Sequence, residues 1–186
     1  MAMPHAATGW TVEMVHALPE DGKRYEIIDG ELFVNPAPRL LHQAAVLELV
    51  TRLRAYVRQH GIGLAMMSPA DIIFGPRTLV QPDVFVSLPF VGRAPREWNE
   101  VKLLLAVEVL SPSSQRADRM VKRRLFQRER VPEYWIMDVD ARLVSRWRPD
   151  DARPEEIDGR LEWAPDPALA PLVLELPEFF ASLEEI

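Results

Sequence analysis

Residues 103–112 read Leu-Leu-Leu-Ala-Val-Glu-Val-Leu-Ser-Pro, an apolar run that holds one carboxylate, Glu108. A short apolar run closed by Ser-Pro is typical of a buried β-strand. A carboxylate inside such a strand is costly unless it is paired, protonated or bound to a metal ion. Glu108 therefore indicates a site of chemistry rather than ordinary packing.

The segments around this strand alternate between strand and helix patterns. In chain order, the predicted elements are a short amphipathic piece at 12–18, a hairpin at 25–34 with an Asp-Gly turn, a helix at 39–60, strands at 64–68, 71–74 and 80–87, the Glu108 strand, a helix from Ser113 or Ser114 to about Arg130, and strands at 132–139 and 143–147. This order predicts an α/β (α+β) fold, with a mixed central β-sheet flanked by helices.

Length and composition place the chain among ordinary globular proteins. Its 186 residues predict a single domain over 1–186, with a core at about 24–148 and an acidic, Pro-rich C-terminal extension at 150–186. The extension has a weak strand pattern at 172–176 and a short terminal helix pattern. There is no cysteine, which excludes disulfides, thiol catalysis and thiolate metal sites. Without a leader or a run of transmembrane length, we expect a cytoplasmic protein with no membrane contact.

Asp83 is a second carboxylate in a strand-like run, at residues 79–86. It follows Pro82, which suggests the start of a strand or an irregularity. Taken alone, Asp83 is equally well interpreted as a turn residue beside a proline. Two carboxylates on separate buried strands that converge at the strand ends would form a site for a hard divalent cation such as Mg²⁺. Asp83 and Glu108 together therefore predict a metal site.

The helix after Glu108 has one face that includes Asp118, Val121, Lys122 and Leu125. Val121 and Leu125 indicate that this face is turned to the sheet, so Asp118 and Lys122 would lie on the inward side. The plain alternative is an exposed ion pair four residues apart, which contributes only a few tenths of a kcal/mol. The functional interpretation brings the Lys122 ammonium close to the two carboxylates.

Three further side chains are weaker candidates. His42 precedes Val46 by one helical turn and so extends the apolar stripe of its helix, where a histidine is more often a half-buried residue than a ligand. Glu26 and Glu31 flank the Asp-Gly turn, and glutamates of a hairpin are usually solvated. His42 and Glu31 are kept as auxiliary candidates.

Several short sequence motifs, taken in order, resemble those of the Uma-two family of restriction endonucleases. They are Tyr-Glu-Ile-Ile-Asp-Gly-Glu at 25–31, Gln-Pro-Asp-Val at 81–84, Glu-Val-Leu-Ser-Pro-Ser at 108–113, Asp118 with Lys122, and Val-Pro-Glu-Tyr-Trp-Ile-Met-Asp at 131–138. The resemblance covers about residues 24–148. It implies a restriction-endonuclease-like fold with a Pro-Asp…Asp/Glu-x-Lys site. The chain departs from the broader pattern because Leu110 occupies the lysine position, and the resemblance implies that Lys122 takes its place.

The resemblance also implies a mechanism, the Mg²⁺-dependent hydrolysis of DNA. Asp83 and Glu108, with the backbone carbonyl of Val109, would bind one or two Mg²⁺ ions, or Mn²⁺ in their place. Lys122 would orient or deprotonate the attacking water or offset charge on the phosphate. The position of Asp118 one turn away suggests that it tunes or holds Lys122.

A nucleic-acid substrate requires basic contacts, whereas the chain has a net charge of -6. Residues 115–130 nevertheless hold seven Arg or Lys against two acids, which allows a local basic surface. We expect DNA contacts from that helix and from the loop before the Glu108 strand, and the residues are Arg116, Arg119, Arg123, Arg93 and Arg96. Cutting of both strands would be simplest for a two-fold homodimer.

Two other functions stay open. The first is a catalytically inactive nuclease fold that acts as a binding or assembly module, which the net charge and the absent in-register lysine favour. The second is a metal-dependent hydrolase of small phosphate esters, which would need no basic groove. In the tail, Trp163, Phe179 and Phe180 could serve a dimer interface, although packing in the core is the preferred interpretation.

Overall fold

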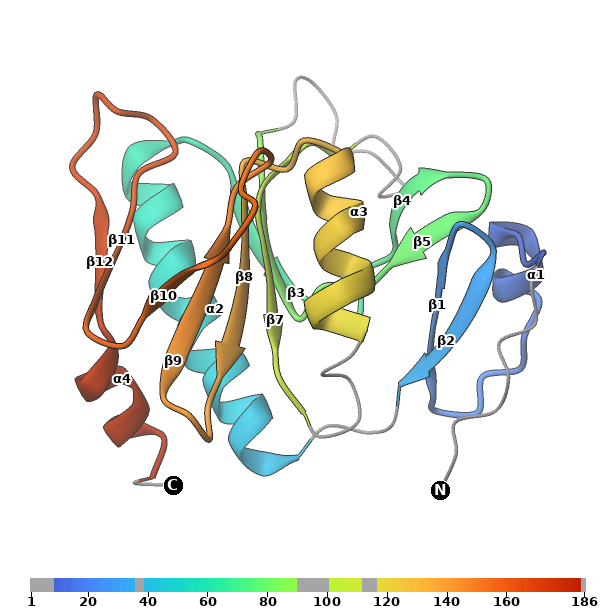
Figure 1. The fold of residues 1–186 in the computed structure, drawn as a ribbon, viewed down its shortest axis with the longest axis horizontal. Helices are drawn as coiled ribbons and strands as arrows, with labels where there is room; N and C mark the ends of the chain where they lie inside the picture. Colours follow the sequence, from blue (N-terminus) through green and yellow to red (C-terminus); the bar gives the residue numbers. More distant parts are fainter. Residues whose placement is uncertain (1–8, 36–38, 90–100, 112–116, 185–186) are drawn as a thin grey trace.

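The computed structural model describes residues 9–35, 39–89, 101–111 and 117–184 (Figure 1). The helical segments are α1 (Val12–His16), α2 (Leu40–His60), a π-helical turn (Ala117–Lys122), α3 (Arg123–Arg128) and α4 (Leu176–Ser182). The strands are β1 (Arg24–Ile28), β2 (Glu31–Asn35), β3 (Leu64–Met67), β4 (Ile72–Gly75), β5 (Thr78–Val80), β6 (Val84–Ser87), β7 (Leu103–Val109), β8 (Glu133–Asp138), β9 (Leu143–Trp147), β10 (Glu155–Ile157), β11 (Arg160–Trp163) and β12 (Leu172–Glu175). Within the described ranges, no helix is long and apolar enough to cross a membrane.

The central sheet has six strands in the order β10-β9-β8-β7-β6-β3. β7 and β8 are parallel, and every other neighbouring pair is antiparallel. A parallel pair needs a crossover connection, which here contains the π-helical turn and α3. β7 is the predicted Glu108 strand. Because it has a strand on each side and helices on both faces, almost all of its residues are buried.

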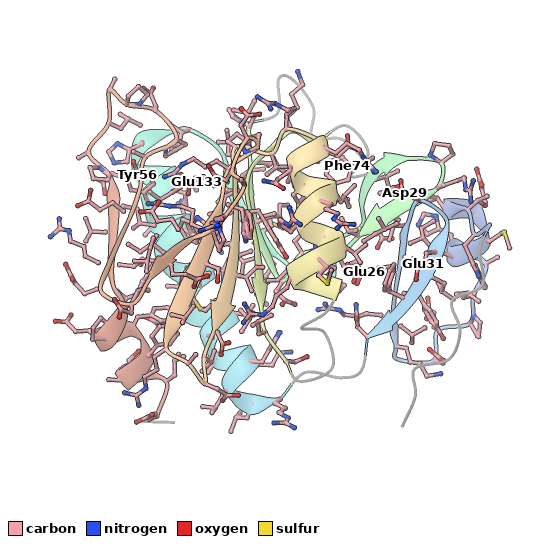
Figure 2. The ribbon with its side chains drawn as sticks, in the orientation of Figure 1. Glu26, Asp29, Glu31, Tyr56, Phe74 and Glu133 are labelled. Atoms are coloured by element: carbon pink, nitrogen blue, oxygen red, sulfur yellow. The ribbon has the colours of Figure 1, made fainter. Side chains whose placement is uncertain are left out.

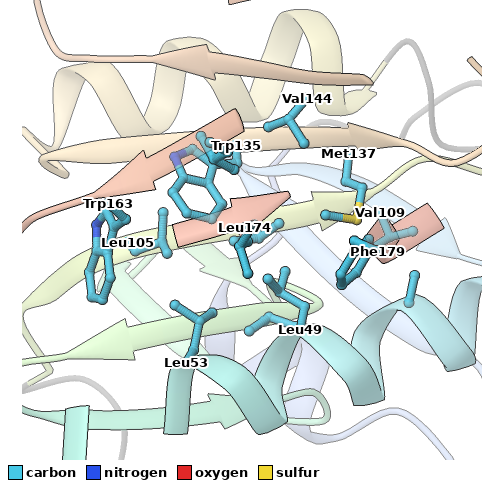
Figure 3. Close-up of a cluster of buried hydrophobic side chains, with 14 of the residues drawn as sticks. Leu49, Leu53, Leu105, Val109, Trp135, Met137, Val144, Trp163, Leu174 and Phe179 are labelled. Carbon is cyan, nitrogen blue, oxygen red and sulfur yellow. The ribbon is translucent and has the colours of Figure 1, made fainter. Parts of the chain in front are cut away.

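α2 covers one face of the central sheet. Its apolar stripe packs against inward residues of the strands, and Figure 3 shows Leu49 and Leu53 beside Leu105 and Val109. The helix ends at His60, and Gly61 adopts the left-handed conformation with φ of 64°. Glycine adopts this conformation without a steric cost, so the predicted end of the helix is confirmed.

The C-terminal segment packs on the same face as α2. β11, β12 and α4 contribute side chains to the main core cluster, where Trp163, Phe179 and Phe180 are almost fully buried. Figure 3 shows Trp163 and Phe179 beside side chains of α2 and the sheet. The expected use of these residues in core packing is confirmed.

α3 and a second sheet cover the opposite face (Figure 1). The second sheet has four strands in the order β2-β1-β5-β4. Leu125 and Phe126 of α3 pack with Phe85 and Tyr134 of the central sheet in a separate core cluster. The hairpin is joined to α3 through Asp29, whose two carboxylate oxygens accept hydrogen bonds of 2.8 and 3.0 Å from Arg128.

The segment 80–87 differs from its prediction as one strand. Val80 ends β5 in the second sheet and Val84 begins β6 in the central sheet, so residues 81–83 pass between the two sheets. Pro82 lies in this link, where its missing N–H removes no ladder hydrogen bond. β10 and β11 are additional strands in the C-terminal segment, and the predicted caps Ser113 and Ser114 lie outside the described residues.

Candidate active site

Glu108 lies on the α3 side of the central sheet. Side chains alternate along β7, so Val107 and Val109 pack on the α2 side while Glu108 shares the opposite side with Ala106. Glu108 is 2% exposed. Glu108 is the second-last residue of β7, so this buried carboxylate lies near the end of an internal strand.

Asp83 reaches the same place from the link that leads into the neighbouring strand. Val84 is the first residue of β6 and pairs with Val107 of β7, so Asp83 lies just before the strand, close to the end of β7. Its carboxylate contacts β7 directly, through the backbone N–H of Val109, the residue after Glu108. Asp83 is 3% exposed, which makes it the second buried carboxylate of the cluster. The predicted convergence of the two strand ends is therefore observed.

Lys122 brings an ammonium to Glu108. It is the last residue of the π-helical turn, and its Nζ lies 2.9 Å from Oε1 of Glu108. Its side chain is 3% exposed, so the prediction that Lys122 faces the sheet is confirmed. Lys122 is therefore not part of an exposed ion pair with Asp118, which was the alternative interpretation. The backbone of Asp118 belongs to the same turn, but its side chain lies outside the described part of the structure.

Glu26 is a third buried carboxylate, which the sequence interpretation treated as solvated. It is fully buried, and its Oε2 lies 2.9 Å from Nζ of Lys122. Oε1 accepts a 2.6 Å hydrogen bond from the backbone N–H of Gln81, and Oε2 accepts one from the Asn35 amide. The sequence could have indicated Glu26 in the same way as Glu108, because each is a carboxylate within an apolar strand pattern.

Glu31, the hairpin glutamate kept as an auxiliary candidate, is not part of this cluster. It begins β2 next to the turn, where it pairs with Ile28, and it is exposed. Figure 2 labels Glu26 beside α3 and Glu31 farther out on the hairpin. The two glutamates flank one turn, but only Glu26 contacts Lys122.

The Asp83 carboxylate is held by three donors from three elements. Its Oδ1 lies 3.0 Å from Nη1 of Arg24 on β1. Its Oδ2 lies 3.0 Å from Nε2 of His42 on α2 and accepts a 3.0 Å hydrogen bond from the backbone N–H of Val109. His42, an auxiliary candidate, is thus placed in the site, whereas Arg24 was not anticipated. Val109 contacts Asp83 through its N–H, and its carbonyl remains a predicted ligand.

These contacts keep Asp83 ionised. Burial would raise its pKa, but the hydrogen bond and charge of His42, with the charges of Arg24 and Lys122, hold the pKa well below its usual range. Since an ionised carboxylate only accepts hydrogen bonds, Nε2 of His42 carries the hydrogen of their shared bond. Nδ1 of His42 is buried and has no hydrogen-bond partner among the described residues.

Comparisons with known proteins bear on the family and the fold of the chain. The sequence model of the Uma2 family, described as "Putative restriction endonuclease", matches residues 12–179. The chain belongs to the Uma2 family. It is also similar to the crystal structure of "a putative nuclease belonging to DUF820" from Anabaena variabilis, with a TM-score of 0.73 and 26% identity over 94% of this chain and 99% of that one. The predicted family and the predicted restriction-endonuclease-like fold class are confirmed. None of the curated proteins matches the chain.

The donor set of this Uma2 family member fits Mg²⁺. Among the described residues, no three imidazole or carboxylate side chains lie close enough together to enclose a metal ion by themselves. Mg²⁺ does not require such an enclosure, because proteins commonly bind it through one or two carboxylates plus water and substrate phosphate oxygens. Asp83, just before β6, and Glu108, near the end of β7, supply two buried carboxylates.

Two of the five arginines predicted to contact DNA are described. Arg119 is exposed and its guanidinium donates a 3.0 Å hydrogen bond to Asp138. Arg123 stacks over the ring of Trp147, with 4.8 Å between Cζ and the ring centroid. The remaining three lie outside the described residues, and they are Arg93, Arg96 and Arg116.

Proposed function

We propose that this protein is a metal-dependent endonuclease that hydrolyses phosphodiester bonds of DNA. The observation that carries the proposal is the buried cluster in which Asp83 accepts a hydrogen bond from the N–H of Val109, next to Glu108, and Lys122 lies 2.9 Å from Glu108. Membership of the Uma2 family and the likeness to a structure described as "a putative nuclease" support the same class of reaction. DNA as the substrate also implies a cytoplasmic location.

In this scheme Asp83, Glu108 and the backbone carbonyl of Val109 hold Mg²⁺, or Mn²⁺ in its place. The bound cation would lower the pKa of a water ligand and offset negative charge on the phosphate. Lys122, an ammonium held between two carboxylates, orients the attacking water and offsets charge as the phosphate is attacked. Asp118 keeps its proposed role of holding Lys122.

Three neighbouring groups position these residues without contacting the substrate. His42 and the Val109 N–H fix Oδ2 of Asp83, which sets the direction of the other carboxylate oxygen. Glu26 holds Lys122 through a second ion pair, in addition to the pair with Glu108. Reactive groups held this way need little rearrangement when the substrate arrives, which is a large part of enzymatic rate enhancement.

DNA would be bound by the basic residues of the crossover helix and of the preceding loop, and these are Arg93, Arg96, Arg116, Arg119 and Arg123. A two-fold homodimer would present two such surfaces and cut both strands. Light scattering during gel filtration tests this part of the proposal. A monomer at every concentration would contradict the dimer and leave the assignment of the site unaffected.

The central test is cleavage of plasmid DNA with Mg²⁺ by the parent protein and three variants. We expect Asp83→Asn and Lys122→Met to lose activity by roughly 100-fold or more, the usual scale for removal of a group that stabilises the transition state. Asp158→Asn is the matched control, because Asp158 is an exposed aspartate of the C-terminal segment. Cleavage by Asp83→Asn and Lys122→Met at the parent rate would contradict the proposal.

A second candidate function is that of an inactive nuclease fold that serves as a binding module. The ion pairs of the cluster favour it, because Arg24 and Lys122 already neutralise Asp83 and Glu108 without a metal ion. Isothermal titration with Mn²⁺ distinguishes the two candidates. The endonuclease requires binding that Asp83→Asn abolishes, whereas the binding module has no need of the metal. A panel of nucleotides is tested as substrates beside DNA. Hydrolysis of the nucleotides but not of DNA would indicate a hydrolase of small phosphate esters instead of the endonuclease or the binding module.

A further inference from the structure

The two oxygens of the Asp83 carboxylate are not equivalent. Oδ2 accepts hydrogen bonds from Nε2 of His42 and from the backbone N–H of Val109, at 3.0 Å each. A carboxylate oxygen has about two lone-pair positions, so these two donors fill Oδ2. Oδ1 is therefore the atom of Asp83 with room for a further ligand.

The group at Oδ1 is the Arg24 guanidinium, whose Nη1 lies 3.0 Å away. Arg24 comes from β1 of the second sheet and is the more accessible partner, with 25% of its side chain exposed against 4% for Asp83. Its Nε is buried and has no hydrogen-bond partner among the described residues. The guanidinium therefore neutralises Asp83 while at least one of its donors stays unused.

Arg24 keeps its charge throughout. Burial by itself would lower the pKa of its guanidinium, but the charges of Asp83, Glu108 and Glu26 outweigh this and raise it. A divalent cation on Oδ1 would meet this fixed positive charge at the same oxygen atom, and like charges so close repel strongly. A divalent cation that bound Oδ1 would therefore compete with Arg24 for this oxygen.

An anion placed beside both groups removes the conflict. A phosphodiester can share one oxygen with a divalent cation and present another to a guanidinium, whose donors match phosphate geometry. Arg24 is more exposed than Asp83, so its guanidinium is the group of this pair that lies nearer the solvent. We propose that Arg24 is a further active-site residue, which occupies Oδ1 of Asp83 in the metal-free protein and transfers to a substrate phosphate oxygen when the cation binds. This inference rests on the proposed function.

The transfer of Arg24 from Asp83 to a substrate phosphate predicts a result that a purely structural role for Arg24 does not predict. Removal of the guanidinium should strengthen metal binding in the absence of DNA, because the competitor for Oδ1 is gone. The same change should weaken DNA binding in the presence of metal, because a phosphate contact is lost. If Arg24 had a purely structural role, its removal would weaken both metal binding and DNA binding.

The experiment compares Arg24→Gln with the parent protein and with Arg160→Gln. Arg160 is an exposed arginine of β11 that pairs with Glu162, so it controls for the loss of one positive charge. Isothermal titration measures Mn²⁺ affinity, and fluorescence anisotropy measures the affinity for a labelled DNA duplex with Ca²⁺ as the cation. We expect Arg24→Gln to bind Mn²⁺ at least about threefold more tightly and DNA about tenfold more weakly. Arg160→Gln should match the parent in Mn²⁺ affinity.

Arg24→Lys guards against a folding defect. Lysine keeps the charge and lacks the fork, so this variant should bind Mn²⁺ about as the parent does and still lose DNA affinity. Equal or weaker Mn²⁺ binding by Arg24→Gln would overturn the inference, as would unchanged DNA binding. If the parent binds Mn²⁺ and Arg24→Gln matches it, only this inference fails. If the parent binds no Mn²⁺, the proposed function fails with it.

Discussion

Each buried charge of the site has a compensating partner from a different element. Asp83 is held by Arg24 and His42, and Lys122 lies between Glu26 and Glu108. The loss of one partner from a buried pair leaves an uncompensated charge, which destabilises far more than the loss of an exposed pair. The cluster is therefore both the candidate active site and a determinant of stability.

Glu26→Gln tests this dependence at a residue that the sequence interpretation missed. The amide would turn a donor toward the Lys122 ammonium, the Asn35 amide or the Gln81 N–H, all of which are donors to Glu26. We expect the free energy of unfolding to fall by about 2–3 kcal/mol, the cost of a lost hydrogen bond to a charged group. Urea denaturation measures it. Glu31→Gln, an exposed glutamate of the same hairpin, is the control and should change stability by less than about 0.5 kcal/mol.

The lowered pKa of Asp83 gives stability a definite dependence on pH. The folded state holds the pKa below the ordinary value of 3.8, so the contribution of Asp83 is complete above that value. It is lost as the pH falls from there toward the lower pKa of the folded state. We expect acid denaturation of the parent to be steeper in this window than that of Asp83→Asn. Parallel curves of unfolding free energy against pH would contradict the assignment.

Three elements position the site, and their connections explain why it forms. The link into β6 brings Asp83 to the end of β7, next to Glu108, and the crossover from β7 to β8 returns Lys122 to Glu108. The crossover begins as a π-helical turn, whose wider i→i+5 spacing is often found at functional sites. The apolar periodicity of the sequence predicted the facing of Lys122, but it did not predict this local geometry.

The register of β6 also depends on Gly63, which lies just before β3. A Cβ atom at this position would come within 2.1 Å of the backbone carbonyl oxygen of Ser87, the register partner of Leu64. Gly63→Ala should therefore lower the free energy of unfolding by roughly 1–3 kcal/mol, as overpacking does. Gly159→Ala, where no atom lies within 4 Å of the added Cβ, is the control and should be close to neutral. Equal melting temperatures for the two variants would show that the β3 edge adapts at little cost.

At the scale of the whole molecule, the C-terminal segment completes the core on the α2 side. Trp163 is 1% exposed and packs against Trp135 and Tyr56, with ring centroids 6.5 and 5.7 Å apart. Tyr56 also donates a 2.7 Å hydrogen bond to the carbonyl of Ala170, which joins α2 to the segment before β12. The C-terminal segment therefore contributes to the packing, and so to the stability, of the sheet that carries the site.

Trp163→Ala tests this dependence far from the charges of the site. Removal of a buried tryptophan should lower the free energy of unfolding by about 3–5 kcal/mol. Leu47→Ala is the comparison for an exposed apolar residue, since Leu47 is 61% exposed, and it should change stability by less than about 0.5 kcal/mol. The measurement is urea denaturation followed by circular dichroism. A small effect of Trp163→Ala would mean that the segment packs only loosely on α2.

The sequence by itself determined the features that depend on local periodicity. Strands repeat every second residue and helices every 3.6, so an apolar pattern identifies the buried side of each element and any charge that lies on it. Glu108, Asp83 and the sheet-facing Lys122 could be predicted in this way. The hairpin, α2 and the helical crossover could be predicted for the same reason.

Only the tertiary structure decided which of the remaining polar residues join the site. Arg24 and Asp83 are 59 residues apart in the sequence, Arg24 on a strand of the second sheet and Asp83 in the link between the two sheets, so no local pattern relates them. A glutamate in a hairpin has the same sequence pattern whether it faces water, as Glu31 does, or a neighbouring helix, as Glu26 does. Packing between the two sheets across α3 selects between these environments, because contacts between distant segments exist only in the folded chain.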